Sequence, residues 1–500
     1  MKKIRTIILT TFCAALTMTS CDMDKYPYDK IPVESVPANL SDCQSLRSGM
    51  YRDLRIIASN SDTFMASEML ADCLVPTNNY GNQWSSQYLW EIAASDGSAT
   101  TAWNNAYVAI AQCNLLINGI ERLQTEGKLT DSEAAEAENI LGEAYLIRAM
   151  MYYDLATRFC SLYDAATAES TLGVPLVDTY APSADNSTFP GRSSLAATYQ
   201  FILDDISSAK ENLTAEGAQE SEYLTTDALT AFEARVALMM GNYDTAITAS
   251  TTLINAQKYP LINDQAKFSN MWLNDIGTEL ICQLYSSQQE LSGAMGAWFL
   301  DEVTNNVTIL PAYDILTLYS ETDIRFNAYF AKATVNFANG TIAEPYVVKK
   351  YPGNPAMYTG TNNYVNKLKL FRISEMYLIA AEAYYKKGDA TSAGKSYEVL
   401  YQLMSARDAS VQNTPVTGNK LWKLIQDERL KELCYEGTRW LDLKRYGEGF
   451  TRMSSQSDDL SYNFGLNQEV AADDHQWVWP IPQDEIEANP QIKGQQNPGY

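Results

Sequence analysis

A short stretch of the sequence places amide groups beside aromatic rings. Its members are Asn78, Asn79, Tyr80, Trp84 and Tyr88. Sugar recognition uses flat aromatic faces for the apolar side of a pyranose ring, and amide or carboxylate groups for its hydroxyls. Residues 72–100 also contain Pro, Gly and Asn, which favours a structured loop. We therefore expect a loop that could bind a sugar, although a ring such as that of Trp84 could instead pack against helices.

A second group of residues carries charge at helical spacing. Its members are Glu428, Arg429, Glu432, Glu436, Arg439, Asp442 and Arg445. Acid–base catalysis by two carboxyl groups requires that the pKa of one be raised selectively. Here Glu428, Glu432 and Glu436 recur every four residues among arginines, which favours an ion-pair network within the last helical repeat.

We interpret two further charged pairs in the same way, namely Arg372 with Glu375 and Asp323 with Arg325. Each pair is close in sequence, so that an ion pair is the simplest account of it. The sequence therefore predicts no catalytic residue.

A third chemical feature lies at the N-terminus. The opening MKKIR is basic, and Thr6 to Met18 are apolar or small, as in a secretory signal peptide, here residues 1–20. The apolar run is shorter than the roughly 20 residues that span a bilayer. Cys21 follows two small residues, and a cysteine in this position can be lipidated. The pattern is similar to a bacterial lipobox, with Met18 where leucine is commoner; the alternative is an ordinary signal peptide.

Metal and nucleophilic chemistry have little support in the sequence. Six cysteines follow Cys21, namely Cys43, Cys73, Cys113, Cys160, Cys282 and Cys434. No two of them have the C-x-x-C spacing, and His475 is the single histidine. This argues against a Cys/His metal site and against a histidine-dependent hydrolase, and no cofactor is expected. Most of the cysteines are interpreted as small buried side chains, although pairing of some stays open.

The charge of the chain also limits its partners. The sequence has 37 basic and 61 acidic residues, and removal of the signal peptide takes away three of the basic ones, which leaves a net charge of −27. A surface of this sign repels phosphate backbones and anionic lipid, so a nucleic-acid partner is not expected. The 46% hydrophobic content predicts a large folded core.

Paired helical patterns separated by short turns recur along the chain. In residues 225–260, apolar side chains repeat every three to four positions, and Gly241 with Asn242 interrupts the repeat. Residues 371–409 show the same pattern of two helical segments, with the turn at Gly388. Residues 101–123, 137–159 and 421–449 are further helical candidates. The sequence therefore predicts an all-α fold of tetratricopeptide-like repeats with long irregular loops.

Residues 261–369 depart from this pattern, because most of their length has no sustained helical period. We expect an irregular insertion there. Long connections on a repeat scaffold often carry the binding site. The proposed organisation is a signal peptide (1–20), an N-terminal half (21–216) and a C-terminal half (217–500), with the mature chain forming one globular fold.

Several segments together resemble the SusD/RagB family. In chain order they are AWNNAYVAIAQCNLLI, EAYLIRAMMYYDLATRF, FRISEMYLIAAEAYYKKGD, IQDERLKELCYEGTRWLDLKRYGEG and the closing WPIPQDEIEANPQIKGQQNPGY. The resemblance runs from Cys21 to Tyr500. The family consists of surface lipoproteins of Bacteroidetes that cap a SusC-like TonB-dependent outer-membrane transporter and capture nutrients, mostly glycans and in some members peptides.

This resemblance implies further expectations for the site and the location. Family members place ligand-contacting residues in the loop that corresponds to residues 78–88, and in a second patch of the later insertion. Trp298, Tyr346 and Tyr358 are available for that patch. Acidic residues directly after Cys21 resemble a signal for export to the outer face of the outer membrane.

The expected function is capture of an oligosaccharide and its delivery to the transporter, without catalysis. A peptide ligand is the alternative within the family. An α-helical glycoside hydrolase would instead need two carboxyl groups facing one sugar bond, and a pure protein-interaction scaffold would bind neither glycan nor peptide.

Overall fold

Long helices form the first half of the chain in the computed structural model, which describes residues 36–301, 304–462 and 469–500. The predicted signal peptide (residues 1–20) and the predicted lipid-bearing Cys21 lie outside the described residues. The helices are α2 (Leu40–Ala58), α3 (Ser61–Leu70), α4 (Ser85–Leu89), α5 (Gly97–Thr125), α6 (Asp131–Phe159), α7 (Leu195–Asn212), α8 (Thr226–Met239) and α9 (Tyr243–Asn255).

The second half contains shorter helices and then two more helical pairs. These helices are α10 (Gln265–Leu273), α11 (Tyr313–Leu316), α12 (Phe326–Tyr329), α13 (Ile373–Lys387), α14 (Ala390–Arg407), α15 (Gly418–Leu433), α16 (Arg439–Tyr446) and α17 (Gln483–Ala488). The all-α, tetratricopeptide-like prediction is confirmed, because the expected hairpins are α8–α9 and α13–α14, and α5, α6, α15 and α16 occupy the other predicted segments.

Local sequence explains where the hairpins turn. Gly241 and Gly388 adopt φ values of +72° and +75°, in the left-handed region that favours glycine. The side chain of Asn242 then accepts a hydrogen bond from the backbone of Thr245 at the start of α9, and Asp389 caps α14 in the same manner. Each turn therefore ends one helix and begins the next.

Small residues let the helices approach closely. Helix α13 contacts α8, α9, α14 and α15, and α6 contacts α5 and α7. A Cβ atom added at Gly142 of α6 would lie 2.5 Å from the backbone nitrogen of Leu213, at the end of α7. Ala380, Ala381 and Ala383 of α13 are buried. This stack forms the main core of the molecule.

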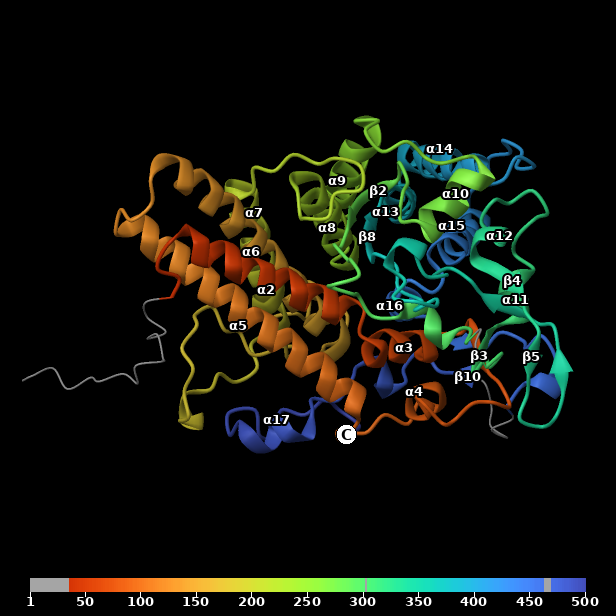
Figure 1. Ribbon diagram of the computed structural model, residues 1–500, viewed down its shortest axis with the longest axis horizontal. Helices are drawn as coiled ribbons and strands as arrows, with labels where there is room; N and C mark the ends of the chain where they lie inside the picture. Colours follow the sequence, from red (N-terminus) through yellow and green to blue (C-terminus); the bar gives the residue numbers. More distant parts are fainter. Residues whose placement is uncertain (1–35, 302–303, 463–468) are drawn as a thin grey trace, which may run out of the picture.

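Most of the short antiparallel strands cluster at the end of the molecule opposite α7, and one pair lies nearer the middle, beside α8 and α13 (Figure 1). Among the described residues they form two-stranded sheets. The pairs are β1 (Leu74–Pro76) with β3 (Ile309–Pro311), β2 (Leu280–Gln283) with β8 (Lys369–Arg372), β4 (Phe330–Lys332) with β7 (Tyr346–Val348), β5 (Val335–Asn336) with β6 (Ile342–Ala343), and β9 (Phe450–Thr451) with β10 (Glu469–Val470). The β1–β3 pair connects the early loop to residues 261–369, whereas β9 and β10 pair within the C-terminal segment.

Candidate functional site

The pairing of β1 with β3 brings two loops together at the strand-rich end. Beyond β1, the backbone nitrogen of Thr77 donates to the carbonyl of Thr308 over 3.0 Å, and its hydroxyl donates to the carbonyl of Val307 over 2.7 Å. Trp84 of the first loop then meets Trp298 of the second. Their ring centroids are 4.7 Å apart, at an interplanar angle of 80°.

Both tryptophan side chains are half-buried. The local backbone conformation sets the position of each of them. Trp84 precedes α4 with a φ of +55°, a conformation that is uncommon for a bulky residue. Trp298 closes a short 3₁₀ turn, Met295–Trp298. Both rings also pack against the buried clusters of the core, so each is partly covered and partly exposed. Trp84 and Trp298, two of the predicted aromatic residues, therefore form one aromatic pair, although they come from different loops.

The two predicted amides hold the loops in place. The side-chain nitrogen of Asn79 donates to the side-chain oxygen of Asn306 over 2.6 Å and to the carbonyl of Asn336 over 2.8 Å, and its oxygen accepts from the backbone of Ala338 over 2.6 Å. Asn78 donates to the carbonyl of Asp459 over 2.7 Å. The amides therefore fix the architecture around the tryptophan pair, with less capacity left for a ligand.

Tyr80 and Tyr88 are buried, at 6% and 7% exposure. The guanidinium carbon of Arg452 lies 3.8 Å from the ring centroid of Tyr88, and the ring of Tyr80 packs against Tyr462 at 6.2 Å. The hydroxyl of Tyr80 donates to the carbonyl of Gln83. Burial raises the pKa of both phenols. The rings of Tyr80 and Tyr88 are therefore packed inside the protein, and their faces are not open to a sugar.

The remaining predicted aromatics occupy different places. Tyr346 lies on β7, where its ring contacts Phe326 at 5.3 Å. Tyr358 is half-buried, and its hydroxyl donates to the carbonyl of Gly353 over 3.3 Å. The later insertion thus contributes Trp298 to the pair, while Tyr346 belongs to a separate groove.

The charged cluster of the C-terminal helices forms buried ion pairs, as predicted, but not a single network. Glu428, Glu432 and Glu436 belong to one network, whereas Asp442 pairs with Arg429 and Arg445, and Arg439 pairs with Asp72.

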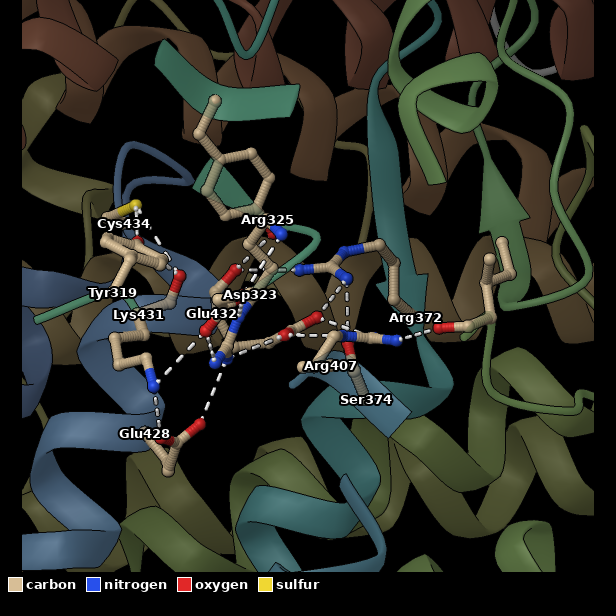
Figure 2. A network of polar contacts seen from close by, with 12 residues as sticks. Tyr319, Asp323, Arg325, Arg372, Ser374, Arg407, Glu428, Lys431, Glu432 and Cys434 are labelled. Atoms are coloured by element: carbon tan, nitrogen blue, oxygen red, sulfur yellow. Dashed lines mark hydrogen bonds and ion pairs between the residues drawn. The ribbon is translucent and has the colours of Figure 1, made fainter. Parts of the chain in front are cut away.

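Figure 2 shows Arg325, Arg372 and Arg407 converging on Glu432, at nitrogen–oxygen distances of 3.3, 2.8 and 2.9 Å. Burial alone would raise the pKa of Glu432, but Arg407 and then the other two arginines hold it well below its usual range.

The network extends over segments far apart in sequence. Its carboxylates are Glu279, Asp323, Glu428, Glu432 and Glu436, and its cations are Arg325, Lys350, Arg372, Arg407 and Lys431. The numbers of positive and negative groups match, and each carboxylate has a cation within 4 Å. A carboxylate that is held between buried cations is poorly placed to act on a ligand. The network therefore has a structural role.

One predicted pair within this network is wrong. Arg372 was expected beside Glu375, but it bonds Glu432 and Glu436, and Glu375 pairs instead with Arg235 of α8 over 2.7 Å. Arg372 is the last residue of β8 and Glu375 lies in the first turn of α13, so the change from strand to helix sends the two side chains in different directions. The other predicted pair, Asp323 with Arg325, is confirmed at 2.7 Å.

The described residues offer little support for disulfide bonds or for a metal site. Its six cysteines are all buried and unpaired, and within the described ranges no three His, Cys, Asp or Glu side chains are grouped so that they could hold a metal ion. Among the helices of these ranges, none combines the length and apolar character needed to cross a membrane.

Comparisons with known proteins agree with this architecture. A sequence model described as SusD family matches residues 312–500, and one described as "starch-binding associating with outer membrane" matches residues 24–238. SusD-like protein P38 of Formosa agariphila is 26% identical, over 78% of each chain. A SusD superfamily protein from Bacteroides thetaiotaomicron is 28% identical with a TM-score of 0.78, covering 92% of this chain and 100% of that structure. Surface glycan-binding protein A from Bacteroides fluxus is 18% identical with a TM-score of 0.67, covering 92% and 99%.

The stacked helical hairpins, with a loop region carried at one end, define a helical-repeat protein of the tetratricopeptide type. The chain belongs to the SusD family, since the two sequence models match both of its halves and a member structure superposes along nearly all of it.

Proposed function

We propose that this protein captures an oligosaccharide and delivers it to a TonB-dependent transporter of the outer membrane. The observation that carries the proposal is the Trp84–Trp298 pair, because two loops from distant parts of the chain place half-buried rings in contact at the strand-rich end. Flat apolar ring faces suit the apolar side of a pyranose. The starch-binding description of the model that matches residues 24–238 supports the same ligand class.

No catalytic step belongs to this proposal. The described carboxylates most suggestive of acid–base chemistry are each paired with cations in the buried network. A binding protein that passes its ligand on is better served by modest affinity than by slow release. Ring stacking, with few charged contacts, is consistent with such affinity.

The tryptophan pair gives a direct test. We expect Trp84→Ala and Trp298→Ala each to weaken binding of a glycan identified on an array by about 1–3 kcal/mol, because each change removes a ring face and its contact area. Isothermal titration calorimetry measures this loss, and melting curves report on folding. Trp422→Ala is the matched control, because Trp422 is also half-buried but stacks on Tyr385 at 5.2 Å in the helical region. Unchanged affinity in both loop variants, with normal melting, would rule out the pair as the ligand site.

A lipid on Cys21 would hold the protein at the membrane. The support comes from the sequence, in which a short apolar run ends at this cysteine, and from the outer-membrane description of the matching model. Replacing Cys21 with alanine should move the protein from the membrane fraction to the soluble fraction. Mass spectrometry of the wild type should find acyl chains on Cys21, and an unmodified cysteine in a membrane-bound wild type would contradict the expectation.

Delivery to a transporter predicts a stable partnership. Gentle detergent extraction of native membranes should therefore co-purify this protein with a SusC-like transporter. Recovery of only the free protein, under conditions that preserve other membrane complexes, would argue against the delivery step while leaving glycan binding in place.

A further inference from the structure

Arg452 lies in the C-terminal segment and joins it to the loop that carries Trp84. It directly follows β9 and is buried, at 9% exposure. Its guanidinium group donates to the carbonyl of Ala71, to that of Met69 over 3.1 Å and to that of Tyr88 over 2.5 Å. Among the described residues, no ion pair joins this group to a carboxylate. A buried cation that is bonded to main-chain carbonyls therefore holds the loop.

The contacts of Arg452 close the base of this loop. Met69, Leu70 and Ala71 form the C-terminal end of α3, where main-chain carbonyls have no partner within the helix. Arg452 bonds the first and third of these carbonyls, and the indole nitrogen of Trp90 donates to that of Leu70 over 3.1 Å. The chain therefore leaves the end of α3 and returns to it at Trp90, so that the segment between them forms a closed loop.

A short helix connects the residue that Arg452 holds to Trp84. The guanidinium carbon of Arg452 lies 3.8 Å from the ring centroid of Tyr88, and the same group bonds the Tyr88 carbonyl. Tyr88 belongs to α4, and its backbone nitrogen donates to the carbonyl of Trp84 over 3.0 Å. A single helical turn thus separates Tyr88 from the residue that meets Trp298. Each step from Arg452 to the tryptophan pair is a direct contact.

The conformation of Trp84 requires support of this kind, because its backbone φ is +55°. A bulky residue rarely adopts the left-handed region, and it stays there only where the surrounding structure determines its conformation. Trp90, at the other end of α4, has a φ of +56°. The helix between them has five residues, which is too short for stability on its own. The loop therefore depends on contacts from outside, and Arg452 supplies three hydrogen bonds to it and to the end of α3.

We propose that Arg452 is a positioning residue for the ligand site. It holds the loop in the conformation that places Trp84 against Trp298, and does not itself contact the ligand. The inference rests on the proposed function and adds how the site keeps its shape, namely through a buried cation from the C-terminal segment. Such preorganisation raises affinity, because an ordered loop loses little conformational freedom when the ligand binds.

Arg452→Met is the test variant, because it removes the donors and keeps an apolar side chain. The carbonyls at the ends of α3 and α4 then lose their partners, and the loop rearranges to satisfy them. Arg192→Met is the matched control. Arg192 is also buried, at 8% exposure, and donates to the carbonyls of Gly173 and Gln495 and to the side chain of Asn497. These partners lie outside the loop, so this control reports what the loss of a buried guanidinium group does through stability alone.

Circular dichroism of the mature protein reports the position of Trp84 without any ligand. Two indole rings in contact couple their electronic transitions and give paired bands of opposite sign. Subtracting the spectrum of Trp84→Phe from that of the wild type isolates the signal of the Trp84–Trp298 pair. The same subtraction, made with the double variants, isolates it in Arg452→Met and in Arg192→Met. We expect Arg452→Met to lose this signal and Arg192→Met to keep it.

Affinity electrophoresis measures the effect on binding, in native gels that contain starch, xylan, galactomannan or pectin. For a polysaccharide that retards the wild type, Arg452→Met should bind about tenfold more weakly, as expected when the competent loop is populated only about one-tenth of the time. Arg192→Met should bind as the wild type does, although both variants lower the melting temperature. Arg452→Lys keeps a charged donor without the planar fork, so its affinity should lie between those of the wild type and Arg452→Met.

The outcomes separate the inference from the proposed function. An unchanged dichroism signal in a folded Arg452→Met would overturn the inference, as would equal losses of affinity in Arg452→Met and Arg192→Met. If Arg452→Met does not fold, a folded Arg452→Lys with the signal and affinity of the wild type would overturn it. Loss of the signal with unchanged affinity would overturn both the inference and the role of the tryptophan pair. A wild type that none of the four polysaccharides retards would overturn the proposed function, while the dichroism signal would still decide whether Arg452 holds Trp84.

Discussion

Replacing Glu432 with glutamine should lower the free energy of unfolding by about 3–5 kcal/mol, the range seen when one partner of a buried ion pair is removed. Glu432 is fully buried and accepts hydrogen bonds from Arg372 and Arg407, with Arg325 within 3.3 Å. Glutamine keeps the shape but removes the negative charge. The three guanidinium groups would then be buried with too few carboxylates.

Urea unfolding followed by circular dichroism measures this change. Glu138→Gln is the matched control, because Glu138 is an exposed helical glutamate and its neutralisation should change the free energy of unfolding by less than about 0.5 kcal/mol. A similar, small change in both variants would show that the network adds little to stability, as if solvent reached it freely.

This network shows which features of the ion pairs can be predicted from the spacing of charged residues alone. The repeat of Glu428, Glu432 and Glu436 correctly predicts ion pairs on one face of α15, because residues four apart are neighbours on a helix. Spacing cannot identify the partners, however. Arg325 belongs to the insertion and Arg407 to the end of α14, so only the packed fold brings them to Glu432.

The hairpins were predictable because their signals are local. Apolar periodicity defines each helix, and glycine or asparagine at the turn defines its end. The short strands lack such signals. β1 has three residues and pairs with β3, more than two hundred residues away, so neither alternation nor turn chemistry could identify it.

The sequence predicts which residues gather in the candidate site better than it predicts which of their side chains are exposed. The loop of residues 78–88 does carry Trp84 to a position beside Trp298. Tyr80 and Tyr88 turned out to be buried, because Arg452 and Tyr462 from the distant C-terminal segment cover their rings.

A second large effect is expected at Glu68 of α3. Its side chain is only 1% exposed, and one oxygen accepts from the backbone nitrogen of Gly437 over 2.6 Å. The other oxygen has no hydrogen-bond partner among the described residues. Burial raises the pKa of Glu68 from 4.5 to about 7; Glu436 and Asp72 add to the rise, and the Gly437 amide and Lys350 oppose it.

The sign of the resulting pH dependence follows from proton binding. Between pH 4.5 and about 7 the folded protein keeps the Glu68 proton, whereas the unfolded chain has lost it. The native state then binds more protons, so this group makes stability fall as pH rises through that window. Above pH 7 the group leaves a constant penalty of about 3 kcal/mol, from roughly 1.4 kcal/mol for each unit of pKa shift.

Glu68→Gln should remove this penalty, because glutamine keeps an acceptor for Gly437 and does not ionise. The free energy of unfolding of the variant, relative to wild type, should therefore rise by up to about 3 kcal/mol between pH 4.5 and pH 8. Any cost of placing an amide beside the unpartnered position is the same at every pH, so only the slope reports on ionisation. Urea unfolding at several pH values measures it, with Glu138→Gln expected to give a flat difference. A flat difference for Glu68→Gln as well would mean that Glu68 is already ionised in the folded protein near pH 5, with its buried charge stabilised by Gly437 and Lys350.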